Sequence, residues 1–263
     1  MKKRIVVISG VTGAIGSALL AEYAHDENTV VYGISRKARP VKDFLRNGKL
    51  PLRTLICSIG RENDYSSLFR HMDYGVDEIV YVHAIGLFPF EVNHKGVITV
   101  ENDRDGDGVN DEVTKLTFDA FVNATTNLHT YWRGKTACIL FGGMSDKYYP
   151  LVHQSWCKTM EKVKGYMRRE VKRQKELSML VFNISSVLCP HELITRSFVF
   201  TDTDADQTCW LSPHELVKFV LKETTRAGCG FREFEKFRKK PNFSPEVYYA
   251  NDRFTPRKVK ELY

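Results

Sequence analysis

The sequence contains no long apolar run, and this absence excludes a helical membrane span. None of its stretches reaches the roughly 18 apolar residues that such a span needs. The apolar run that follows the basic start breaks at Ser9-Gly10, which is too early for a signal peptide. We therefore expect a cytoplasmic protein, and its 43% of hydrophobic residues is ample for a globular core.

The cysteines do not form any CxxC pair, so the chain lacks the spacing of a redox motif. Four of the six cysteines lie in or beside apolar runs. This distribution is typical of buried thiols in a reducing compartment and excludes a disulfide framework. The six are Cys57, Cys138, Cys157, Cys189, Cys209 and Cys229.

The net charge of +7 is unevenly distributed along the chain. Residues 226–263 hold ten Lys/Arg against five Asp/Glu. A basic tail suits nucleic acid, an anionic membrane surface or a phosphorylated ligand, but the commoner alternative is a solvated surface. The tail matches no nucleic-acid-binding module, so nucleic acid is not an expected partner.

Short β-branched runs alternate with stretches of helical periodicity, which predicts a parallel sheet covered by helices on both faces. No internal repeat or low-complexity linker interrupts the alternation. We therefore expect one α/β domain over residues 1–225, followed by a basic extension over 226–263. The predicted strands are 4–9, 29–34, 52–57, 78–83, 137–142 and 177–185. The predicted helices are about 15–25, 65–72, 118–131, 155–174 and 213–221, the last with Ser212 as N-cap.

A glycine-rich loop links the first predicted strand to the first predicted helix. Its glycines, Gly10, Gly13 and Gly16, have the spacing GxxGxxG. The first permits a tight turn, the second lets a pyrophosphate approach the backbone, and the third allows close packing of helix and strand. Together with its neighbours Thr12 and Ile15, the loop predicts a dinucleotide site in a doubly wound Rossmann fold. The Lys-Ser/Thr ending of a P-loop is absent, which argues against ATP or GTP.

The end of the second predicted strand lacks the acidic residue that would bind the ribose 2′-hydroxyl of NAD. Arg36 and Lys37 occupy that place instead. A guanidinium can bind a 2′-phosphate through two hydrogen bonds, so the pair favours NADP(H), with NAD(H) as the weaker alternative. The other interpretation is that both are solvated loop cations.

These features together resemble the short-chain dehydrogenase/reductase family over about residues 4–225. The resemblance rests on the glycine loop, on Val82-His83-Ala84-Ile85-Gly86 after the fourth strand, and on Ser212-Pro213-His214-Glu215 at a late helix. It implies an oxidoreductase whose cofactor is lined by Ala84 and Gly86. It also implies that Pro190 and Thr195, after the sixth strand, reach the nicotinamide end.

Catalysis in that family needs a serine and a Tyr-x-x-x-Lys pair, which lies on one helix face. Lys158 fits the lysine by register, and the resemblance implies that it binds the ribose. However, Gln154 stands where the tyrosine should be, and an amide cannot act as a general acid. The serine is also displaced, since two glycines end the fifth strand and Ser145 follows them.

Two tyrosines offer a replacement proton donor. Tyr148 and Tyr149 precede the long helix, and Tyr149 forms a YxxxH pair with His153. That register would lengthen the connection to the sixth strand, so we prefer Gln154 and Lys158 as the equivalent pair. The alternative role for both tyrosines is packing.

An acidic insert at residues 101–112 contains the pattern DxDxDGxxD. Alternating aspartates on a sharply turning loop can supply the oxygens that calcium prefers. The bidentate glutamate of a complete EF-hand is replaced by Thr114, and the alternative is an Asx-turn surface loop. The candidate calcium ligands are Asp103, Asp105, Asp107 and Asp111.

Two functions therefore stay open. The first is an NADP(H)-dependent oxidoreductase with an atypical active site, acting on a small carbonyl or alcohol. The second is a protein that binds the cofactor without catalysis and serves as a sensor or partner subunit. The missing tyrosine favours the second, whereas Lys158 and Thr195 favour the first. The sequence leaves a homo-oligomer open.

Overall fold

The structure analysed is a computed structural model of the 263-residue chain. It describes residues 3–35, 52–56, 75–84, 90–92, 98–100, 109–143, 154–185, 187 and 211–236. The strands are β1 (Arg4–Ser9), β2 (Thr29–Ser35), β3 (Leu52–Ile56), β4 (Glu78–His83), β5 (Phe90–Val92), β6 (Ile98–Val100), β7 (Lys135–Gly143), β8 (Leu177–Ile184) and β9 (Gly230–Lys236). The helices are α1 (Ala14–Tyr23), α4 (Val109–Tyr131), α6 (Gln154–Arg173) and α8 (Pro213–Arg226).

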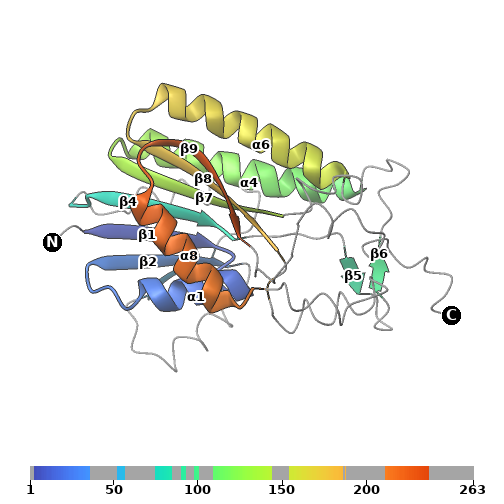
Figure 1. Ribbon diagram of the computed structural model, residues 1–263, viewed down its shortest axis with the longest axis horizontal. Coiled ribbons are helices and arrows are strands. Elements are labelled where there is room, and N and C mark those ends of the chain that lie inside the picture. Colours follow the sequence, from blue (N-terminus) through green and yellow to red (C-terminus); the bar gives the residue numbers. More distant parts are fainter. Residues whose placement is uncertain are drawn as a thin grey trace, which may run out of the picture.

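Seven strands form one parallel sheet in the order β3-β2-β1-β4-β7-β8-β9 (Figure 1). The chain builds outward from β1 to β3, then crosses back to place β4 on the other side of β1. This reversal is the topological switch point of a doubly wound fold, and ligands of such folds bind outside the carboxyl ends of the strands beside it. The predicted fold class is therefore confirmed.

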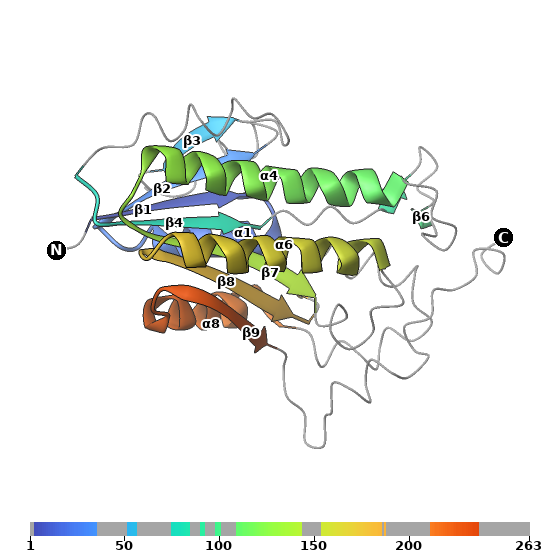
Figure 2. The same cartoon turned by 90° about the horizontal axis from the view of Figure 1, so that it is seen from above.

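Two layers of helices cover the sheet, α4 and α6 on one face and α1 and α8 on the other (Figures 1 and 2). The alternating direction of side chains along each strand sends one set of apolar residues to each layer. The core on the first face includes Tyr81, Phe121 and Met167, and that on the second includes Leu19 and Phe182. Because both faces are covered, the central strands are buried along almost their whole length, as their uninterrupted apolar runs indicate.

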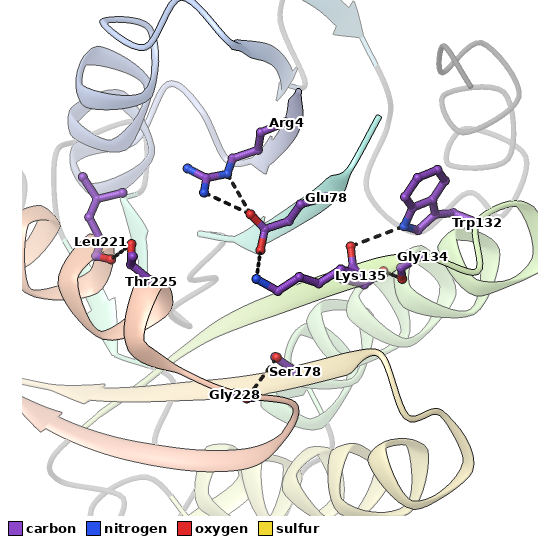
Figure 3. Close-up of polar contacts among 10 residues, drawn as sticks. Arg4, Glu78, Trp132, Gly134, Lys135, Ser178, Leu221, Thr225 and Gly228 are labelled. Atoms are coloured by element: carbon purple, nitrogen blue, oxygen red, sulfur yellow. Dashed lines mark hydrogen bonds and ion pairs between the residues drawn. The ribbon is translucent and has the colours of Figure 1, made fainter. Parts of the chain in front are cut away.

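Charged residues at the amino ends of three neighbouring strands form a connected group (Figure 3). Arg4, Glu78 and Lys135 begin β1, β4 and β7 and lie in register. The Glu78 carboxylate accepts hydrogen bonds from Arg4 at 3.0 Å and from Lys135 at 2.8 Å. Burial opposes ionisation of Glu78, but the two cations outweigh it and hold the pKa of this carboxyl below its usual range.

The structure extends the predicted domain at its carboxyl-terminal end. Strand β9 pairs with β8 and α8 continues to Arg226, so the boundary that we predicted after residue 225 lies too early. Helix α8 begins as predicted, with Ser212 accepting the Glu215 N–H at 3.1 Å and Glu215 accepting the Ser212 N–H at 3.0 Å in a capping box. Helix α4 starts at Val109 rather than at Phe118. The predicted helix at 65–72 lies outside the described residues.

Two further features complete the described parts. Strands β5 and β6 form an antiparallel pair that lies beyond the carboxyl ends of the main sheet (Figure 1). Cys138 is a buried free thiol on β7, as expected, and burial raises its pKa well above the usual range. Among the helices of the described ranges, none combines the length and apolar content that a bilayer span requires.

Candidate functional site

The glycine loop follows β1 directly, at the switch point of the sheet. Gly10 has a φ of +80°, in the left-handed region that glycine adopts without strain. Its N–H donates to the Ile34 carbonyl at 3.1 Å, and the Gly13 N–H donates back to the Gly10 carbonyl at 3.0 Å. The loop is therefore a tight turn that is hydrogen-bonded to the end of β2, as the sequence predicts.

The third glycine of the loop leaves no room for a side chain. A Cβ at Gly16 would lie 2.2 Å from the Gly10 carbonyl oxygen and 2.8 Å from the Val11 Cα, both backbone atoms that cannot rotate away. Close packing also occurs at Gly33 on β2, where a Cβ would lie 3.0 Å from the Val11 side chain. The absence of a side chain at Gly16 therefore lets the first turn of α1 lie directly against the backbone of the loop.

The amino end of α1 has the features of an anion site. Gly13 is its N-cap and provides no side-chain cap, and the first turn contains no acidic residue. The first N–H group bonded within the helix is that of Ser17, which donates to the Gly13 carbonyl at 2.8 Å. The preceding N–H groups lack intrahelical acceptors and, with the positive end of the helix dipole, favour a phosphate. Thr12 beside them is exposed.

The end of β4 lies next to this loop. The Ala84 N–H donates to the Ser9 carbonyl at 2.9 Å. The Val82–Ala84 segment therefore lies directly beside the start of the glycine loop at the switch point. The structure thus brings together the predicted cofactor residues Gly10, Thr12, Gly13, Ile15, Gly16 and Ala84.

His83 ends β4 as a buried imidazole, only 1% exposed. Its Nδ1 lies 3.0 Å from the Tyr81 hydroxyl, and its ring meets Phe121 edge-on at 5.6 Å. Its Nε2 is buried without a hydrogen-bond partner. Burial lowers the pKa of His83 to about 3, so the ring is neutral at physiological pH. The sequence placed His83 only within the segment after β4, since nothing in its neighbours indicated an unpaired nitrogen.

Helix α6 carries the predicted catalytic pair at its start. Gln154 is the first residue of the helix, and Lys158 follows one turn later with an exposed side chain. Lys158 lies on the opposite side of the helix from Met160, Val163 and Met167, which pack on the sheet. The sequence predicts that Lys158 binds the cofactor, whereas in the structure Lys158 lies on the outward face of α6.

The buried lysine of α6 is Lys164, which sequence reasoning missed. Its side chain is 6% exposed, and its Nζ lies 3.1 Å from Glu233 on β9. Arg168 and Asn183 donate to the same carboxylate at 2.8 and 3.3 Å. Burial opposes ionisation of Glu233, but Lys164, Asn183 and Arg168 outweigh it and hold its pKa below the usual range. The Asn183 Oδ1 is buried without a partner near the carboxyl end of β8.

Several predicted site residues lie outside the described residues. Of the four candidate calcium ligands only Asp111 is described, and it lies in the first turn of α4 rather than in a loop. No group of three or more possible metal ligands occurs within the described ranges. The residues outside them are Arg36, Lys37, Gly86, Ser145, Tyr148, Tyr149, His153, Pro190, Thr195, Asp103, Asp105 and Asp107.

No protein-family model matches the sequence, and no curated protein does either. Solved structures of similar fold do match. A short-chain dehydrogenase/reductase from Vibrio parahaemolyticus is 12% identical, with a TM-score of 0.64 over 89% of this chain and 100% of that one. An alcohol dehydrogenase from the archaeon Thermococcus sibiricus, complexed with 5-hydroxy-NADP, is 11% identical, with a TM-score of 0.65 over 92% and 100%.

A third structure gives the same result. The short-chain dehydrogenase/reductase described as a glucose/ribitol dehydrogenase from Brucella melitensis is 11% identical, with a TM-score of 0.68 over 89% of this chain and 96% of that one. At these identities the similarity shows the fold alone. The chain therefore has the Rossmann fold in the form found in short-chain dehydrogenases/reductases, over almost the whole length of those proteins.

Proposed function

We propose that the chain is an NADP(H)-dependent oxidoreductase that acts on a small carbonyl or alcohol. The observation that carries the proposal is the turn from Gly10 to Gly16. It packs so closely on the start of α1 that a side chain at Gly16 would meet backbone atoms. The uncapped helix end beside it, without acidic residues, suits the pyrophosphate of a dinucleotide. These residues fit the cofactor that similar folds bind.

The bound cofactor would supply the hydride, and the protein would position it and move the proton. Arg36 and Lys37, which follow β2 in the sequence, would bind the 2′-phosphate of NADP(H). His83, with its pKa near 3, is a poor general acid at neutral pH. Gln154 has no proton that titrates. The proton donor in this proposal is therefore Tyr149 or Tyr148, with Ser145 as the group that steadies the substrate oxygen.

Fluorescence titration of the purified protein with NADPH and NADH tests cofactor binding. We expect saturable NADPH binding, and Lys158→Ala should weaken it if Lys158 holds the nicotinamide ribose. Lys162→Ala is the matched control, since Lys162 is an exposed lysine one turn further on the same helix face. Equal binding by both variants and the wild type would remove Lys158 from the site, and absence of NADPH binding would refute the proposal.

Turnover with a panel of aldehydes and ketones tests catalysis. A positioned general acid accelerates a reaction by about 10²–10⁴-fold, so Tyr149→Phe or Tyr148→Phe should lower turnover by that factor. If both variants keep wild-type turnover, Ser145 or a water donates the proton. Gln154→Tyr, which restores the Tyr-x-x-x-Lys spacing, is the matched gain-of-function variant.

The second candidate is a protein that binds the cofactor without catalysis, as a sensor or partner subunit. The observation in its favour is that Gln154 and an outward Lys158 occupy the start of α6. NADPH binding without turnover of any substrate in the panel would support this candidate and exclude the enzyme.

A further inference from the structure

Helix α6 has two faces of different character. Its inward face packs on α4 and the sheet through Met160, Val163 and Met167. The helix as a whole contains seven Lys/Arg and two Glu. It lies on the outside of the molecule along most of its length (Figure 2). Its outward face is therefore an exposed and strongly basic surface.

The basic residues of α6 divide into paired and unpaired groups. Lys164 and Arg168 bind Glu233, and Arg173 binds Glu170 at 3.1 Å. The others are exposed and have no ion pair with any residue of the described chain. Their spacing of four, seven and three residues places them along one line of the helix, about 21 Å long at ~1.5 Å per residue. We call these residues the basic row: Lys158, Lys162, Arg169 and Lys172.

A glycine lies in the middle of the basic row. Gly165 follows Lys162 by three residues and precedes Arg169 by four, so it shares their face. Glycine destabilises a helix interior relative to alanine. A Cβ at this position would meet only the Arg169 side chain, at an ordinary contact distance of 3.6 Å. Packing within the protein therefore does not require Gly165, whereas a partner that approaches the helix backbone closely would.

We propose that the basic row is a docking surface for the sugar-phosphate backbone of a nucleic acid. A row of unpaired cations about 21 Å long suits the phosphates that follow one another along a nucleic-acid strand. A membrane fits less well, because Tyr131 on α4 is the one exposed large apolar side chain among the described residues. The contacts reach phosphates alone, so binding would be independent of base sequence.

Fluorescence anisotropy with a short mixed-sequence DNA duplex tests the proposal on the full-length protein. Each phosphate contact contributes a slope of about −0.9 to the dependence of log Kobs on log salt. Lys162→Gln/Arg169→Gln should therefore reduce the slope by about 1.8 between about 50 and 200 mM NaCl, and weaken binding at least tenfold at the lower salt. Lys158 is left intact because it is a candidate cofactor residue.

The matched control is Lys218→Gln/Lys222→Gln, which removes the same net charge from exposed positions on α8, on the other face of the sheet. This variant should keep the wild-type slope. Gly165→Ala should raise the melting temperature and weaken duplex binding.

Equal losses in the control and in the basic-row variant would overturn the proposal, as would absence of duplex binding. Binding to phosphatidylserine vesicles but not to the duplex would do so too, and would assign the row to a membrane surface. NADPH binding by Lys162→Gln/Arg169→Gln should be unchanged, which separates this proposal from the proposed function.

Discussion

The two ends of β4 differ in whether a buried polar residue has all of its hydrogen-bond partners. At the amino end, Glu78 is 8% exposed and its carboxylate is bonded to both Arg4 and Lys135. At the carboxyl end, His83 is more deeply buried, yet its Nε2 has no partner. Both residues cost free energy to bury; Glu78 pairs both of its carboxylate oxygens, whereas His83 pairs only its Nδ1, with the Tyr81 hydroxyl.

A similar contrast holds within β8, which lies two strands away from β4 in the sheet. Ser178, near the amino end of β8, donates to the Gly228 carbonyl at 3.2 Å, whereas Asn183 near its carboxyl end keeps an unpartnered Oδ1. Helix α1 begins uncapped at the same carboxyl edge. A buried polar group without a partner is rare in proteins, and an ordered water, an ion or a ligand can satisfy it. Along these strands, the polar groups are paired at the amino edge, where the strands begin, and partly unpaired at the carboxyl edge, where they end. On the helices, His129 Nε2 and Thr224 Oγ1 are also buried without a partner.

The largest effect that we expect is acid destabilisation. Burial lowers the pKa of His83 to about 3, and burial together with Arg133 lowers that of His129 to about 4. Both pKa values lie below the ordinary histidine pKa of 6.5. Between pH 6.5 and these lower values, the unfolded chain therefore binds more protons than the folded chain does. Stability is complete above pH 6.5 and falls as the pH drops, by about 1 kcal/mol per pH unit for His83 and less for His129.

Urea unfolding between pH 6.5 and 4.5 isolates this effect, because Glu78 and Glu233 contribute only below the ordinary glutamate value of 4.5. His83→Gln, which cannot titrate, should remove at least half of the slope of stability against pH. The same slope in this variant and the wild type would show that His83 is not buried as a neutral ring.

Glu78→Gln tests the amino edge of the sheet by removing the negative charge that Arg4 and Lys135 share. The change leaves Arg4 and Lys135 close together without their shared anion, and we expect a loss of about 2 kcal/mol, less than for a fully buried pair because both cations are partly exposed. Affinity for NADPH should not change, since the site lies at the other edge. Glu176→Gln, an exposed residue beside the same edge, is the control and should change neither quantity. A large loss of NADPH affinity with Glu78→Gln would contradict the separation of the two edges.

Cofactor preference sharpens the description of the carboxyl edge. If Arg36 and Lys37 bind the 2′-phosphate, the protein should prefer NADPH to NADH, and Arg36→Ala should reduce that preference about tenfold, or about 1.4 kcal/mol. Fluorescence titration of both cofactors measures it. Equal affinities in the wild type would mean that these residues are solvated loop cations.

The smallest expected effect concerns the acidic insert. If Asp103, Asp105, Asp107 and Asp111 bind calcium, millimolar calcium should raise the melting temperature modestly, because a ligand of the folded state stabilises it by mass action. Magnesium is the control ion. Asp111 lies in the first turn of α4, so it would approach the ion from the helix start. An unchanged melting curve would identify the insert as an ordinary surface loop.

The sequence predicted the parts of the fold whose residues follow simple patterns. β1, β2 and β4 are apolar runs in a sheet covered on both faces, and their bounds agree with prediction to within one residue. Strand β9 was missed because charged residues interrupt it, and the charged partners of Glu233 lie on α6, far away in the sequence. The start of α4 was predicted too late because its first turn, which contains Asp111 and Glu112, was assigned to the acidic insert.

The site was predictable only where backbone geometry determines the residue type. Gly10 and Gly16 are required by a positive φ and by a backbone contact, and such requirements appear directly in the sequence as glycine spacing. The burial of Lys164 and the unpaired Nε2 of His83 depend on tertiary contacts. Lysine is normally exposed, so no local pattern distinguishes Lys164 from the exposed lysines of α6.

The most direct test of the central claim is NADPH affinity after Thr12→Glu, with Thr12→Gln as the neutral control. Thr12 is exposed beside the amino end of α1, so a carboxylate there would occupy the position proposed for the pyrophosphate. A negative charge near the amino end of a helix stabilises the helix, so the free energy of unfolding should be unchanged or rise by about 0.3–1 kcal/mol. We expect Thr12→Glu to weaken NADPH binding at least tenfold while Thr12→Gln binds nearly as the wild type does. If Thr12→Glu binds NADPH as tightly as Thr12→Gln, the loop and the end of α1 do not hold the cofactor's phosphates.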